Sequence, residues 1–164
     1  MTSHPLDLDA ARCRLVLNDL SGEEMVAVAE HALDQWLWCD EFCVLVGLKN
    51  PLIWEVRPIF ERGLRTLGLE CPSRKQALIG VGCWRSMQVL DRMTSPALAA
   101  WSLRQIAGKH WSDCDPLLPF VSLDEDRQSA EGEHWRTVQA RSDRAIVEEA
   151  QRFLRDHSHA FPQP

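Results

Sequence analysis

Apolar and polar positions recur with helical spacing along most of the chain, most clearly in residues 73–93. From Ala77 to Trp84 no side chain is polar, a pattern typical of a helix buried on all sides. The second half becomes amphipathic, with Arg85, Gln88 and Arg92 opposite an apolar stripe of Cys83, Met87 and Leu90. We therefore predict a central helix over 73–93. Its small residues Ala77, Gly80 and Cys83 form a line where another helix can approach closely.

The clearest helix start lies at Ser21, because Glu24 three residues later completes a capping box. A shorter helix is expected before it, from Asp9 to Asn18. The core face of the Ser21 helix is formed by Met25, Ala29, Ala32, Leu33 and Trp36. Its outer face carries Glu30, His31, Asp34, Trp38 and Glu41.

Residues 42–46 are apolar and partly β-branched, so they fit a short strand or the end of a helix. The helix is favoured, because Gly47 provides a stop. Asn50 and Pro51 then predict a new helix start, and Pro58 predicts a break or kink. An apolar stripe follows up to Gly68, formed by Phe60, Leu64 and Leu67.

Ser95 and Pro96 predict a further helix that ends at Gly108. Residues 112–121 contain two prolines and are expected to cross the molecule as an irregular segment. A solvated acidic stretch is expected over 124–134, and a last helix from Trp135 to Asp156. The prediction is an all-α fold: one domain over 1–164, with five to seven helices around 73–93 and frayed ends at 1–8 and 158–164.

The composition is that of a globular protein, with 45% hydrophobic and 26% charged residues in 164. The sequence contains neither an apolar run long enough to span a membrane nor a leader-like start, which predicts a cytoplasmic protein without membrane insertion. In that compartment the six cysteines are expected to be reduced thiols.

The net charge of −6 is unevenly distributed. Residues 1–49 carry nine acids and three bases, residues 50–109 four acids and nine bases, and residues 110–164 eleven acids and six bases. Acidic ends around a basic middle argue against nucleic acid as the main partner. Seven Trp and no Tyr is unusual, and Trp is enriched at protein-binding hot spots.

Candidate chemistry is limited. His110 and Cys114, with Asp113 or Asp115, have the residue types of a thiol hydrolase, but acids beside a thiol oppose thiolate formation. Cys39 and Cys43 lack the CxxC spacing of a zinc site, and Glu-x-x-His is absent. We therefore assign no catalytic residue, cofactor or metal ion.

Two groups remain as candidate protein-binding surfaces: Trp38 with Asp34 and Glu41, and the line of Arg85, Gln88 and Arg92. The alternative for Trp38 is packing beneath residues 112–121. The alternative for the arginines is pairing with the acidic ends of the chain.

Two segments resemble the helices of a known family: residues 78–93, LIGVGCWRSMQVLDRM, and residues 96–111, PALAAWSLRQIAGKHW. An apolar helix ends near Asp91, a Leu- and Arg-bearing helix follows, and Gly108 precedes Trp111. This layout resembles the paired helices of the YscK/OrgA-type accessory proteins of the type III secretion sorting platform. The resemblance implies a cytoplasmic secretion accessory and assigns no functional residue.

The sequence thus favours a non-catalytic protein-binding or adaptor protein of a bacterial cytosol. A second binding role is a toxin-neutralising immunity protein that turns an acidic, Trp-bearing face to a basic toxin. The alternative from another class is a small thiol- or metal-dependent hydrolase that uses His110 and Cys114.

Overall fold

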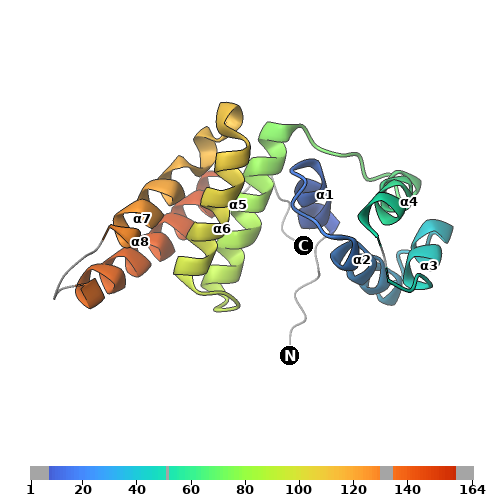
Figure 1. Ribbon diagram of the computed structural model, residues 1–164, viewed down its shortest axis with the longest axis horizontal. Helices are drawn as coiled ribbons and strands as arrows, with labels where there is room; N and C mark the ends of the chain where they lie inside the picture. The colour runs from blue at the N-terminus through green and yellow to red at the C-terminus, as the bar shows by residue number, and fades with distance from the viewer. Residues whose placement is uncertain (1–7, 51, 130–134, 158–164) are drawn as a thin grey trace. The chain divides into compact units, whose positions relative to one another are not determined.

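The computed structural model describes residues 8–50, 52–129 and 135–157. In this part of the chain eight α-helices and two 3₁₀ turns form, and no strand, which confirms the all-α fold with more helices than the five to seven expected. The helices divide into two compact units, Met1–Ser73 and Arg74–Pro164 (Figure 1). A single domain over 1–164 stays a prediction. The expected frayed ends lie outside the described residues, except Leu8, which begins a helix.

Unit 1 contains four helices: α1 (Leu8–Val16), α2 (Gly22–Asp34), α3 (Asp40–Val46) and α4 (Ile53–Thr66). Helices α2, α3 and α4 pack against one another, and α1 packs on α2. Their shared core contains Phe42 stacked on Phe60, with ring centroids 5.5 Å apart. The other large buried side chains of this core are Leu15, Leu20, Met25, Val28, Leu45, Val56 and Leu64.

The predicted capping box at the start of α2 is confirmed. The Ser21 hydroxyl accepts from the Glu24 N–H at 3.2 Å, and the Glu24 carboxylate accepts from the Ser21 N–H at 2.9 Å. Glu24 also accepts from Arg14 at 2.8 Å, which joins α1 to the start of α2. Partial burial alone would raise the pKa of Glu24, but these bonds outweigh it and hold the pKa below its ordinary value.

The end of α2 differs from the prediction. The helix stops at Asp34, so Trp36 is 84% exposed instead of lying on the core face. Trp36 takes a left-handed backbone conformation with φ 65°. Its N–H bonds to the Leu33 carbonyl and the Leu37 N–H to the Ala32 carbonyl, each at 3.0 Å, which is the Schellman pattern of a helix end.

Residues 42–46 belong to α3 and end at Gly47, so the helical interpretation is confirmed. Helix α4 begins at Ile53, later than Asn50 and Pro51 indicated, and continues through Pro58. Of the two outcomes predicted at Pro58, a break is therefore wrong, and a kink stays a prediction. The predicted end at Gly68 is confirmed, and φ is 73° there. A Cβ on Gly63 would lie 2.5 Å from the Phe42 ring, so this glycine allows α3 and α4 to approach.

Unit 2 contains α5 (Arg74–Leu90), α6 (Pro96–Lys109), α7 (Leu118–Gln128) and α8 (Trp135–Asp156), with 3₁₀ turns at Trp111–Asp113 and Asp115–Leu117. Helix α5 packs on α6 and α8, and α7 packs on the same two helices (Figure 1). Successive helices run in roughly opposite directions, as in a four-helix bundle. The core includes Leu78, Leu103, Leu117, Phe120, Ile146 and Phe153.

From Ala77 to Cys83 every residue of α5 except the partly buried Ile79 is buried, as the apolar sequence predicts. In the second half the buried stripe is Cys83, Ser86 and Val89, and Leu90 is exposed, so the expected stripe through Met87 and Leu90 is wrong. A close helix approach exists at Gly82, where a Cβ would lie 2.7 Å from the Phe153 ring and 3.1 Å from Leu117. Gly80 is also buried.

Residues 112–121 are not an irregular crossing segment. They form the two 3₁₀ turns and the first turn of α7, because both prolines lie at early helical positions where their missing N–H costs no bond. Helix α7 continues through 124–128, part of the expected solvated stretch, and buries Asp124. Asp124 accepts from Arg104 at 3.2 Å and from Gln128 at 2.6 Å, which ties α7 to α6. Residues 130–134 lie outside the described residues.

Candidate protein-binding surfaces

Tryptophan is mostly a surface residue in this protein. Six of the seven Trp side chains are exposed, and only Trp84 is partly buried. Three of the exposed rings, Trp36, Trp38 and Trp54, belong to unit 1. Burial of a Trp side chain is stabilising, so the exposed rings contribute little to folding and are candidates for contact surfaces.

The connection between α2 and α3 presents three apolar side chains in succession. Trp36, Leu37 and Trp38 are exposed, Trp38 by 62%, while Cys39 returns to the core. The left-handed turn at Trp36 ends α2 and redirects the chain, so Trp38 lies in a loop and not on the helix face that the sequence indicated.

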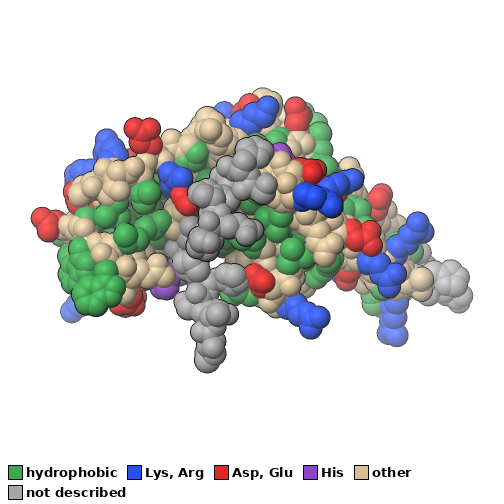
Figure 2. Space-filling model, turned by 180° about the vertical axis from the view of Figure 1, so that it is seen from behind, with side chains coloured by type: hydrophobic (Ala, Val, Ile, Leu, Met, Phe, Trp, Pro, Cys, Tyr) green, Lys and Arg blue, Asp and Glu red, His purple; other side chains and the backbone are tan. Residues whose placement is uncertain are grey.

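Helix α3 adds Val44 and Val46 to the exposed apolar side chains of the connection. We call the set of Trp36, Leu37, Trp38, Val44 and Val46 the α2–α3 surface. Hydrophobic side chains gather over this end of unit 1, at the lower left of Figure 2. Three more exposed apolar residues lie at the start of α4: Leu52, which precedes the helix, and Ile53 and Trp54, its first two residues. They were not singled out from the sequence.

The surroundings of the α2–α3 surface are acidic. Residues 15–48 contain seven Asp and Glu and no Lys or Arg. Glu30, Asp34 and Asp40 are exposed, and within the described part of the chain none forms an ion pair. Glu41, one of the predicted contact residues, accepts a hydrogen bond from Thr66 at 3.2 Å and is half-buried. Asp34 and Trp38 are therefore presented to solvent more fully than Glu41.

The predicted line of Arg85, Gln88 and Arg92 does not form one helix face. Arg85 donates to Gln88 at 3.0 Å and lies over the Trp84 ring at 4.3 Å. Arg92 lies beyond the end of α5, in a left-handed conformation with φ 58°. The line thus separates into a half-buried pair on α5 and an exposed arginine in the following turn.

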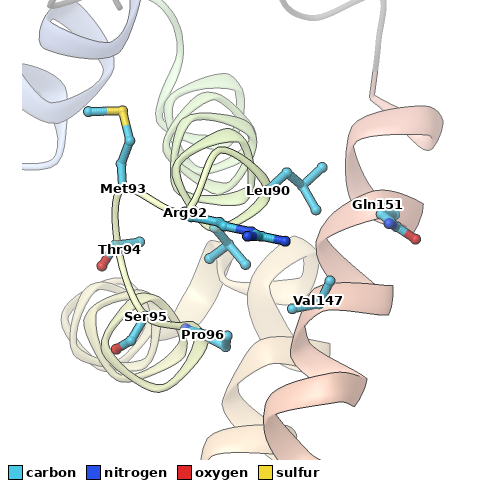
Figure 3. Close-up of a pocket in the computed structure, with 9 residues that line it drawn as sticks. Leu90, Arg92, Met93, Thr94, Ser95, Pro96, Val147 and Gln151 are labelled. Atoms are coloured by element: carbon cyan, nitrogen blue, oxygen red, sulfur yellow. The ribbon is translucent and has the colours of Figure 1, made fainter.

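Arg92 lines a pocket of about 630 Å³ in unit 2 (Figure 3). The pocket lies between the end of α5, the turn to α6 and the middle of α8. Its lining residues are Val89, Leu90, Arg92, Met93, Thr94, Ser95, Pro96, Val147 and Gln151. The sequence carries no signal for this pocket, because it forms only where α8 packs beside a turn some 50 residues earlier in the chain.

The residues predicted for thiol chemistry do not form a site that is open to solvent. Cys114 is 2% exposed, and its thiol donates to the Trp111 carbonyl at 3.2 Å. The Asp113 carboxylate lies 3.6 Å from Arg74 and accepts from Ser112. A buried thiol bonded to the backbone offers no nucleophile to a substrate.

The remaining cysteines are free thiols too. Burial raises the pKa of Cys83 to about 11, and burial also raises the pKa of Cys39. Across residues 8–50, 52–129 and 135–157, no three His, Cys, Asp or Glu side chains come together as metal ligands. Over the same residues, none of the helices has both the length and the hydropathy needed to cross a bilayer.

Comparison with known protein families, curated proteins and solved structures gives no match. The fold and its surfaces define the class: an all-α protein of two helical units, with an acidic, Trp-bearing surface on one unit and an arginine-lined pocket on the other.

Proposed function

We propose that this chain is a non-catalytic protein-binding protein, an adaptor, that contacts a partner through the α2–α3 surface. The observation that carries the proposal is Trp36. It is 84% exposed and has a φ of 65°, a conformation that costs an L-residue about 1–2 kcal/mol and normally selects Gly or Asn. A large aromatic side chain that is almost fully exposed and strains its own backbone does not stabilise the fold. Its presence therefore supports a role in binding.

The acids around this surface support a partner with a basic patch. Glu30, Asp34 and Asp40 are unpaired within the described residues, so a cationic partner would gain attraction without breaking internal ion pairs. Exposed charges are screened by salt, and the association should weaken as ionic strength rises.

The same features favour a narrower second candidate, a toxin-neutralising immunity protein, whose partner would be a basic toxin. A role as a secretion accessory in the cytoplasm is a further specialisation of the adaptor proposal, and it rests on the resemblance of residues 78–111 alone. The hydrolase alternative loses support, because the Cys114 thiol is buried and bonded to a backbone carbonyl.

The test compares Trp38→Ala with Trp111→Ala, which truncates an exposed Trp of the other unit. The partner is captured from a lysate of the source organism with the unmodified protein, purified, and titrated against each variant. We expect Trp38→Ala to lose at least about 2 kcal/mol of binding free energy and little stability. Trp111→Ala should bind as the unmodified protein does.

Thermal melts of both variants complete the experiment. A fully buried Trp truncated to Ala costs about 3–5 kcal/mol of stability. If Trp38→Ala unfolds at a much lower temperature, or if its partner affinity equals that of Trp111→Ala, the α2–α3 surface is structural and the proposal fails.

A further inference from the structure

The pocket in unit 2 has a chemical character that the adaptor proposal does not use. Its walls are mainly apolar, from Val89, Leu90, Met93, Pro96 and Val147. Among the described residues that line it, Arg92 is the single charged one, and none is Asp or Glu. In Figure 3 the Arg92 side chain extends from the turn toward α8, past Leu90 and in the direction of Val147.

The guanidinium of Arg92 is available to a ligand. Within the described residues it has no ion pair or hydrogen bond. Thr94, Ser95 and Gln151 bring further donors, although the Ser95 oxygen already accepts from the Leu98 N–H at 3.2 Å as the cap of α6. A pocket with apolar walls and one unpaired guanidinium is complementary to an apolar group that carries a carboxylate.

The exposure of the lining decides between a small molecule and a peptide. Small-molecule sites enclose about 70–90% of their ligand. Here Leu90, Arg92, Met93, Ser95 and Gln151 are all exposed, Met93 by 61%, so the pocket is open toward solvent along the turn. An open apolar recess of this kind suits a chain that continues beyond the recess, as a peptide does.

We propose that this pocket binds a short, partly apolar segment of a partner protein that carries Asp or Glu, with the carboxylate received by Arg92. This site and the α2–α3 surface share no residue, and the site has the opposite charge preference. The proposal for this pocket is therefore independent of the proposal for the adaptor surface, and either can fail without the other.

The test uses a phage-displayed library of random linear dodecapeptides, selected against the full-length protein. Selected peptides are expected to combine Asp or Glu with apolar residues. Measured by fluorescence polarisation, their Kd should rise at least about tenfold for Arg92→Glu. Arg144→Glu is the matched control, because Arg144 is an exposed arginine of α8 outside the pocket, and it should bind within about twofold of the unmodified protein.

Arg92→Gly separates binding from folding. Glycine fits the φ of 58° at this position, so this variant should melt at or above the temperature of the unmodified protein and still lose the peptides. A second selection against Arg92→Glu should enrich Lys and Arg in place of Asp and Glu.

The proposal is overturned if the unmodified protein enriches no peptides above those recovered with Arg92→Glu. Equal affinity of the selected peptides for Arg92→Glu and Arg144→Glu would overturn it too. So would amide NMR shifts, on peptide addition, that fall outside residues 89–96 and 147–151.

Discussion

At the scale of single residues, the ends of the helices carry the least expected feature of the chain. Within the described residues, four helices are followed by a left-handed residue: Asn18, Trp36, Gly68 and Arg92. At Gly68 both Schellman bonds form, from Gly68 to Arg65 at 2.9 Å and from Leu69 to Leu64 at 2.8 Å. Gly and Asn are the residues this position prefers, whereas Trp36 and Arg92 are strained there. Both strained residues belong to the surfaces proposed to bind partners.

Replacing Trp36 with glycine should therefore stabilise the protein. Trp36→Gly removes a left-handed L-residue and loses little buried area, so we expect the free energy of unfolding to rise by about 0.5–1 kcal/mol in urea titrations. Gly68→Ala is the inverse control: it puts a Cβ at φ 73° with no heavy atom within 4 Å, and should lose about 1 kcal/mol. A less stable Trp36→Gly would show that Trp36 is retained for folding.

Glu24 predicts a pH dependence. Its pKa in the folded state lies below the ordinary value of 4.5, so its charged form stabilises the fold at neutral pH, and this contribution is lost as pH falls through the lowered pKa. Glu24→Gln should reduce the free energy of unfolding by up to about 1 kcal/mol near pH 7, and the difference should shrink near about pH 3. Glu23→Gln is the control, since Glu23 is exposed without an ion pair among the described residues. A loss independent of pH would contradict the assignment.

At the scale of helices, local signals predicted some boundaries correctly and missed others. Ser21 and Ser95 cap α2 and α6 as their side chains indicate, because a cap depends on residues within one turn. The end of α2 could not be predicted, since neither Gln35 nor Trp36 is a usual stop residue. Because the helix was predicted to continue beyond Asp34, Trp36 was expected in the core and Trp38 on a helix face.

The crossing of α5 and α8 gives a prediction about packing. In Gly82→Ala the added methyl would meet the Phe153 ring, and overpacking of this kind costs about 1–3 kcal/mol. Gly108→Ala is the matched control: Gly108 lies inside α6 and no heavy atom lies near its Cβ position, so helix propensity should raise stability by up to about 1 kcal/mol. Denaturant melts of both variants give the sign of the change in the free energy of unfolding. A Gly82→Ala variant more stable than the unmodified protein would refute the close approach.

At the scale of the whole molecule, composition and periodicity were enough for the all-α class but not for its division into units. Residues 73–93 were expected to organise every helix, yet unit 1 builds its own core from α1 to α4. Of the predicted contact residues, Asp34, Trp38 and Arg92 are exposed, while Glu41, Arg85 and Gln88 are partly buried: Glu41 bonds to Thr66 of α4, and Arg85 bonds to Gln88. Periodicity finds the outer side of a helix, but it cannot show which outer residues a neighbouring element will engage.

The two cores predict that damage to one unit leaves the other folded. Phe42→Ala removes a fully buried ring that stacks on Phe60, a change that costs about 3–5 kcal/mol. Hydrogen exchange measured by mass spectrometry should show protection lost in α2, α3 and α4, while α5, α6 and α8 remain protected. Phe120→Ala, which removes a ring packed on Phe153, should give the reverse pattern. If either substitution removes protection from both sets of helices equally, the chain folds as one cooperative domain, as its sequence first indicated.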